Sequence, residues 1–268
     1  AKKFSIDILP PDVRVGNMDF AIKNGKIYYG LGHIKFLSSK VSAEIEKLKN
    51  IKTMFDFWST LHKERIHKRI VLPLISSGAI SFLPLLREGK LSRLLAEVEL
   101  FYELTRKFQE RILNSYKGGI YETILSLDEK TTRRFKKLPR LLNEFRENCQ
   151  KTVHDIFLLE KEYTGVFMRT SPHMVINQEV TPIGELNNGG TIGAYIDDWT
   201  ITHKGHIVMK LVDHTGMITG LVEKDDENYK KWQQMVETTN VAVIEGEKIG
   251  EDILLVKSIN PISAKGGL

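Results

Sequence analysis

Aromatic and basic side chains gather in the last third of the sequence, on and after a predicted strand at residues 191–196. Tyr195 lies on that strand and Trp199 follows it. Aromatic rings stack on any nucleobase and cationic groups attract phosphates, so this mixture is typical of a surface for single-stranded nucleic acid. Either ring could instead pack in a core. The remaining candidates, around the next turn and strand, are His203, Lys204, His206 and Lys210.

The sequence gives little support for a metal site in this region, whether formed by histidines or by paired carboxylates. His203 and His206 have a spacing that metal ligands can use, but no third ligand stands near them in sequence. We therefore predict that they are loop residues facing nucleic acid or solvent. Asp197 and Asp198 are neighbours within a β pattern, and neighbours on a strand point to opposite faces. They are predicted to lie in a solvated turn and not to hold a pair of metal ions.

A second candidate site lies near the N-terminus, where two helix, turn and helix units are predicted. Such a unit directs backbone N–H groups of the turn and of the second helix at a phosphate, without reading any base. Helical patterns at residues 55–59 and 67–79 form the second unit. The candidate DNA-binding residues of the two units are Lys35, Ser38 and Ser39 in the first, and Lys68 and Arg69 in the second.

The elements around the first unit are marked by turn signals. Asn24 and Gly25 predict a tight hairpin between strands at residues 18–22 and 26–29. A short helical turn at residues 30–35 follows, and then a helix with apolar residues on one face. Ser38 or Ser39 is expected to cap that helix. Its apolar face consists of Val41, Ile45 and Leu48.

The elements of the last third follow the order three strands, one helix and two strands. This is the order of a five-stranded OB-fold barrel, and another small barrel is the alternative. The helix places Tyr229, Trp232 and Met235 on one face, and Trp232 is expected to pack against the barrel. The strands are predicted at 191–196, 206–213, 217–222, 241–244 and 253–256, with the helix at 228–238 and a connection at 245–248.

Composition limits the class of protein. The chain has 268 residues, 41% of them hydrophobic, and no apolar run long enough to cross a bilayer, so a multidomain protein without a membrane partner is expected. The single cysteine, Cys149, excludes an internal disulfide framework and a cysteine-rich zinc site. A net charge of +5 suits a nucleic-acid partner without establishing one. Residues 1–4 show no leader pattern, so a cytoplasmic location is expected.

An ordered set of short motifs carries a resemblance to a known family. In order and spacing they resemble the late fingers, tandem helix-hairpin-helix and OB regions of C-family replicative DNA polymerases, of which the bacterial DNA polymerase III alpha subunit is the type. The motifs are Leu9-Pro10-Pro11-Asp12, the run from Ile27 to Lys35, Phe55-Asp56-Phe57, the run from Leu74 to Ser81, the run from Leu159 to Phe167, Ser171-Pro172-His173, Thr202-His203-Lys204-Gly205 and Asp213-His214-Thr215-Gly216.

The resemblance implies an α+β multidomain chain. Residues 1–85 would be the end of the fingers with the tandem helix-hairpin-helix, residues 86–180 a helical linker region, and residues 181–268 the OB-fold domain. The implied function is that of the C-terminal DNA-binding portion of a DNA-directed DNA polymerase used in replication. It would hold primer-template duplex by the helix-hairpin-helix and single-stranded template by the barrel, and other replisome proteins are further expected partners.

The resemblance also bears on catalysis. In this family the palm carboxylates that hold magnesium lie N-terminal to the residues matched here, so this chain is expected to need no cofactor of its own and to be inactive alone. The alternative is a stand-alone, non-catalytic nucleic-acid-binding or replisome scaffold protein. An RNA-binding OB module is a third possibility.

The sequence departs from the family pattern in two places. The first hairpin usually carries glycines, whereas Lys35-Phe36-Leu37-Ser38 has none, which puts phosphate binding by that turn in doubt because a β-carbon limits close approach of the backbone. A sliding-clamp motif is not evident, and residues 150–153 would be at most a degenerate relic. These departures suggest a divergent member, such as one encoded by a phage or mobile element.

Overall fold

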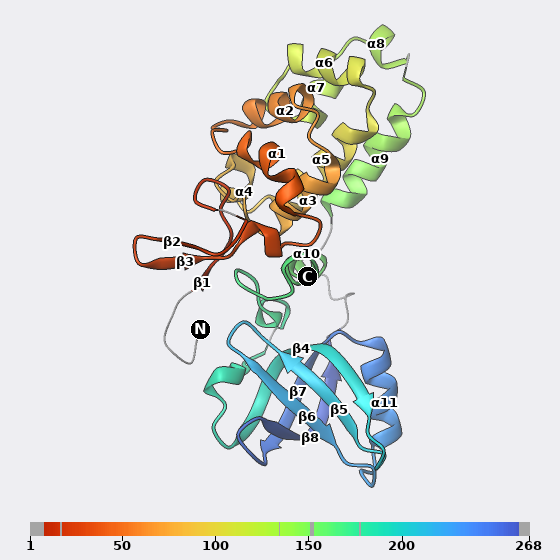
Figure 1. Cartoon of the computed structure of the whole chain (residues 1–268). Coiled ribbons are helices and arrows are strands. Elements are labelled where there is room, and N and C mark those ends of the chain that lie inside the picture. The colour runs from red at the N-terminus through yellow and green to blue at the C-terminus, as the bar shows by residue number, and fades with distance from the viewer. Residues whose placement is uncertain (1–7, 17, 134, 151–152, 177, 263–268) are drawn as a thin grey trace. The chain divides into compact units, whose positions relative to one another are not determined.

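The computed structural model describes residues 8–16, 18–133, 135–150, 153–176 and 178–262. The chain divides into two compact units (Figure 1), one formed by residues 1–151 with 158–165 and the other by residues 152–157 with 166–268. The degenerate clamp-like segment at residues 150–153 and the N-terminal residues 1–4 lie largely or wholly outside the described residues.

A small sheet opens the first unit. Strands β1 (Ile8–Leu9), β2 (Ala21–Lys23) and β3 (Lys26–Tyr28) pair in the order β1-β3-β2, with β2 and β3 antiparallel. Asn24 and Gly25 both have positive φ, 52° and 72°, as a type I′ turn requires. The predicted Asn-Gly hairpin is therefore confirmed.

Two units, each made of a helix, a tight turn and a second helix, follow the sheet. The first consists of η2 (Leu31–His33), η3 (Ser39–Val41) and α1 (Ser42–Glu46), and the second of α2 (Met54–Lys63) and α3 (Lys68–Ser76). Ser38 stands at the N-cap position of η3, but its side chain makes no capping hydrogen bond, so the predicted serine cap is wrong in that respect. A capping box formed by Thr53 and Asp56 starts α2.

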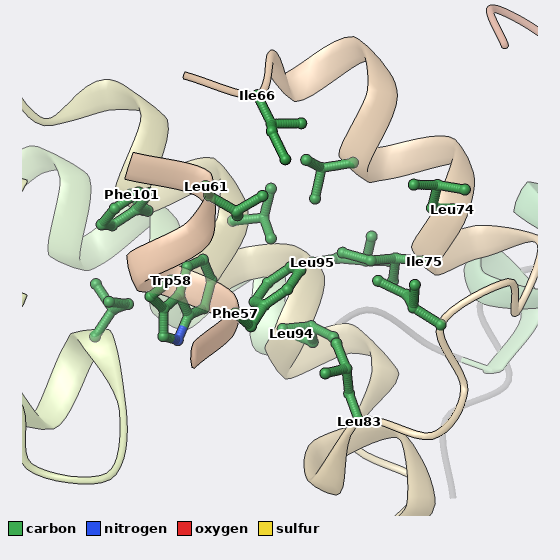
Figure 2. Packing of buried hydrophobic residues seen from close by; sticks show 14 of the residues in the cluster. Phe57, Trp58, Leu61, Ile66, Leu74, Ile75, Leu83, Leu94, Leu95 and Phe101 are labelled. Atoms are coloured by element: carbon green, nitrogen blue, oxygen red, sulfur yellow. The ribbon is translucent and has the colours of Figure 1, made fainter. Parts of the chain in front are cut away.

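The rest of the first unit is helical and shares one core with the two turn units. Phe57, Trp58 and Phe101 are among its fully buried side chains, and Figure 2 shows all three in the same cluster as Leu94 and Leu95. This core runs from Val13 to Phe145 without a break near residue 85. The remaining helices are α4 (Pro84–Arg87), α5 (Leu91–Glu103), α6 (Arg106–Asn114), α7 (Ile120–Leu125), α8 (Glu129–Arg133) and α9 (Leu138–Cys149). Helix α10 (Val153–Thr164) belongs to the first unit from residue 158 onward.

The second unit contains a closed five-stranded barrel, whose neighbouring strands follow the order β4-β5-β6-β8-β7 (Figure 1). In the sequence, helix α11 connects β6 to β7. Three strands, a helix and two closing strands make an OB-type barrel, which confirms the predicted fold. Trp232 on α11 is 4% exposed and packs against the barrel core, as expected. The bounds are β4 Gly189–Ile201, β5 Ile207–Val212, β6 Met217–Val222, α11 Tyr229–Thr238, β7 Val241–Lys248 and β8 Ile253–Pro261, preceded by η4 Pro172–Val175 and η5 Ile183–Glu185.

Two segments differ from the sequence prediction. Residues 245–248 continue β7 and pair with β8 through a register shift, so they are strand and not a connection. Gly189 and Gly190 begin β4 and pair with Glu247 and Gly246. At Gly189 a β-carbon would lie 2.7 Å from the Gly246 carbonyl oxygen, so the two backbones approach too closely for any other residue there.

Candidate nucleic-acid interface

The turn of the first hairpin contains a non-glycine residue with left-handed backbone. Phe36 has φ 71°, Leu37 next to it is buried at 4% exposure, and Ser38 is extended before η3 begins. The Leu37 N–H donates to the Ile34 carbonyl at 3.0 Å, which closes the turn. The Lys35 N–H donates to the Tyr163 carbonyl at 2.7 Å, which fastens the turn to the end of α10.

The turn of the second hairpin repeats this backbone pattern. Arg65 has φ 54°, Ile66 next to it is 1% exposed, and His67 is extended before α3 begins. The Ile66 N–H donates to the Leu61 carbonyl at 3.2 Å, as expected where a left-handed residue ends a helix in a Schellman-type turn. Positions 35–39 and 64–68 thus share a left-handed residue, a buried aliphatic residue and an extended residue before the next helix, while their closing hydrogen bonds span three residues in the first turn and five in the second.

The cations of the two turns differ in what holds them. Lys68 pairs with Glu99 at 2.6 Å, and Lys35 lies 3.8 Å from Glu162. Arg65 and Arg69 are exposed and form no ion pair within the described part of the chain. The predicted residue Arg69 is therefore available to a phosphate, while Lys68 would have to leave Glu99.

Sequence reasoning did not single out Arg65. Its signal lies in the spacing, because the residue stands one position before a buried aliphatic side chain and two before the cap of α3, as Phe36 does in the first turn. Ser38 and Ser39 of that first turn are exposed.

In the barrel, a β-bulge puts Tyr195 and Trp199 on opposite faces of a strand, although simple alternation would put them on the same face. Tyr195 pairs with Val212, but the register shifts between Ile196 and Asp198, so that Trp199 pairs with Met209. Met209 is fully buried in the core, and Trp199 packs against that same core. Tyr195 therefore lies on the outer face and Trp199 on the inner one.

The outer face is partly covered at Tyr195. The ring of Phe167 meets the Tyr195 ring edge-on, with 5.7 Å between centroids. Burial raises the pKa of the Tyr195 hydroxyl above its usual value. The outer face next to it carries Lys210 on β5 and Thr219 on β6, which are paired across the two strands.

The predicted cations of the barrel lie on and beside the turn between β4 and β5. His203 and Lys204 are exposed. The His206 Nδ1 atom accepts the backbone N–H of Lys224 at 3.1 Å, and Lys210 pairs with Asp197 at 2.5 Å. Asp197 is the extra residue of the bulge, so it lies in a strand and not in the solvated turn that the sequence predicted.

A compact polar cluster in this unit was missed by sequence reasoning. Asp213, His173 and His214 have ligand atoms within 4.8 Å of one another, and they make up the one such group among the residues that can be described. The Asp213 carboxylate accepts backbone N–H groups of Ile183 and Thr215, at 2.9 and 2.6 Å. These bonds fasten the Asp-His-Thr-Gly turn to the preceding segment and satisfy the buried carboxylate.

The fold and the turns define a class of protein, one in which a tandem helix-hairpin-helix region and an OB-type barrel occur in one chain. A family model for the helix-hairpin-helix motif matches residues 5–89. That range contains both turns with left-handed Phe36 and Arg65.

Curated relatives agree on one kind of protein, the DNA polymerase III alpha subunit. The subunit of Aquifex aeolicus is 25% identical over 264 residues, which cover 92% of this chain and 20% of the relative. The Bacillus subtilis subunit is 25% identical over 190 residues, or 70% of this chain and 15% of the relative. The Mycobacterium leprae subunit is 37% identical over 92 residues, or 33% of this chain and 8% of the relative.

These similarities confirm the resemblance predicted from the motifs, which is to the helix-hairpin-helix and OB region of DNA polymerase III alpha subunits. The chain spans about a fifth or less of the length of these relatives. Among the helices within the described ranges, none is both long and apolar enough to cross a membrane.

Proposed function

We propose that this chain is a DNA-binding part of a replicative DNA polymerase, which holds primer-template DNA without reading its sequence. The observation that carries the proposal is the pair of matching turns within the helix-hairpin-helix match. Each turn presents a left-handed residue and the start of the next helix at its tip. The second turn adds two arginines that form no ion pair with any described residue. Backbone N–H groups and guanidinium groups bind phosphates regardless of the base.

The barrel is proposed to bind single-stranded template. In OB folds the outer face of the second and third strands and the loops beside them bind oligonucleotides. Here that face carries Lys210 and Thr219, and the loop between β4 and β5 presents exposed His203 and Lys204. Trp199 is not part of this proposed face, because its ring packs against the core.

A charge-reversal experiment tests the helix-hairpin-helix part of the proposal. The double variant Arg65→Glu with Arg69→Glu is expected to bind a fluorescein-labelled primer-template about tenfold or more weakly at fixed salt. The plot of log K against log salt has a negative slope, and loss of two phosphate contacts is expected to make that slope shallower by about 2. Both quantities come from fluorescence anisotropy titrations across a salt series.

The matched control changes the same charge elsewhere in the unit. Lys107→Glu with Lys117→Glu alters two exposed cations outside both turns, and its affinity is expected to stay close to that of the unchanged chain. Circular dichroism melts establish that each variant is folded. Equal losses in the two double variants would mean that DNA is attracted by net charge alone and not bound at the turns.

A further inference from the structure

Phe36 stands in a backbone conformation that its side chain does not favour. At φ 71° a β-carbon crowds the following carbonyl, so glycine is the usual occupant and a bulky aromatic residue is a genuine outlier. Strain of this kind is retained where something else depends on the residue. The backbone alone therefore does not explain why the position carries phenylalanine.

Packing does not explain it either. The core is reached from this turn by Leu37, which is 4% exposed, whereas Phe36 is 59% exposed. The Phe36 ring meets the Tyr163 ring edge-on, with 6.3 Å between centroids, and the Lys35 ammonium lies 5.3 Å from the centre of the Phe36 ring. Single exposed apolar residues are common on protein surfaces, but here the exposed ring also stands on a strained backbone, and the two features together point to a contact with a partner.

The matching position in the second turn indicates what kind of partner this is. Arg65 occupies the same left-handed step, is exposed, and makes no ion pair with any residue in the described ranges. One turn thus presents a guanidinium group and the other an aromatic ring beside an ammonium group. Cations and aromatic rings are the two side-chain types that nucleic-acid surfaces combine, since one binds phosphate and the other stacks on a base.

We infer that Phe36 is a DNA contact of the first hairpin, and that its ring stacks on a nucleobase exposed at a primer-template junction or at an unstacked step. The inference rests on the proposed function. This turn has no glycine through which its backbone could approach a phosphate closely, so an aromatic contact would take the place of a backbone contact. Apolar side chains are known to enter between bases in this way. Lys35 beside the ring supplies a cation for the neighbouring phosphate.

The test uses Phe36→Gly in the full chain, because glycine adopts φ 71° without strain. Thermal stability is expected to stay equal or rise, while affinity for a primer-template falls about fivefold or more, the range measured for loss of one stacked base. The salt slope is expected to stay unchanged because no phosphate contact is lost, unlike in the arginine double variant. Phe36→Tyr keeps a ring and is expected to keep the affinity.

A direct readout of stacking comes from 2-aminopurine placed at the junction. Its fluorescence is expected to change on binding of the unchanged chain and of Phe36→Tyr, and to change much less with Phe36→Gly. Phe55→Ala, which removes an aromatic ring that is 44% exposed on α2, serves as the control and is expected to bind normally.

The outcomes separate this inference from the proposed function. If the unchanged chain binds DNA with salt dependence and Phe36→Gly binds within about twofold of it, the inference is wrong and the proposed function stands. If the unchanged chain binds no DNA at low salt, both the inference and the proposed function are wrong.

Discussion

Replacing Phe57 with alanine is expected to lower the free energy of unfolding by about 3–5 kcal/mol. Phe57 is fully buried on α2, and its ring lies 4.9 Å from that of Trp58, which in turn lies 5.1 Å from Phe101. Removing the Phe57 ring from this cluster (Figure 2) would leave a cavity, which the close-packed neighbouring side chains can fill only in part. Urea denaturation followed by circular dichroism at 222 nm measures the loss.

A matched control lies two positions earlier on the same helix. Phe55 is 44% exposed, so Phe55→Ala removes a ring of the same size from a site that water already reaches. Its cost is expected to stay below about 1 kcal/mol. Similar losses for Phe55→Ala and Phe57→Ala would contradict the packing described for α2.

Stability of the first unit is also expected to fall as the pH rises through neutrality, because of Glu97. This side chain on α5 is fully buried; its Oε1 atom lies 3.3 Å from Arg93, and its Oε2 atom has no hydrogen-bond partner within the described residues. Burial raises its pKa from 4.5 to about 7; Arg93 opposes this rise and nearby Glu122 adds to it. Burial also raises the pKa of the nearby Tyr116 hydroxyl and Cys149 thiol, and the Glu97 charge adds to both rises.

The direction follows from proton linkage. The folded state binds a proton at Glu97 up to about pH 7 and the unfolded chain only up to about 4.5, so the stabilisation is complete below pH 4.5 and is lost as the pH rises through 7. A shift of this size corresponds to about 3 kcal/mol between the two limits. Urea denaturation at pH 5 and at pH 8 measures it.

Glu97→Gln is expected to remove this pH dependence and to be more stable than the unchanged chain at pH 8, because the amide carries no charge to bury. Glu103→Gln changes an exposed carboxylate on the same helix and is expected to leave the dependence as it was. A Glu97→Gln chain that lost stability at pH 8 would show that the ion pair with Arg93 stabilises the fold.

Regular patterns in the sequence predicted the barrel well. Alternating apolar residues marked five strands, and the spacing of Trp232 placed α11 against the core. The Asn-Gly hairpin followed from two residues that tolerate positive φ. In these places local preference and tertiary packing favour the same structure, so the sequence was sufficient.

The bulge at Asp197 could not be predicted, and it changed the candidate site. Alternation puts Tyr195 and Trp199 on one face of a strand, but one extra residue between them turns Trp199 inward. A bulge has no reliable sequence signal in this strand, because it depends on how β4 must bend to pair with both β5 and β7.

The two turns were found in the sequence, but their matching backbone was not. Phe36 and Arg65 are not residue types that predict a left-handed conformation, so only the structure shows that they occupy the same step. Pairing partners were also beyond the sequence: Glu99, which holds Lys68, lies 31 residues further along the chain. Availability of a cation depends on such contacts and not on residue type.

Binding through phosphate contacts and stacking, as proposed for this chain, does not depend on the base sequence. The most direct test measures anisotropy with two primer-templates of unrelated sequence across a salt series. We expect affinities within about threefold of each other, and log K falling linearly with log salt for both. A strong preference for one sequence, or no binding to either at low salt, would contradict the account.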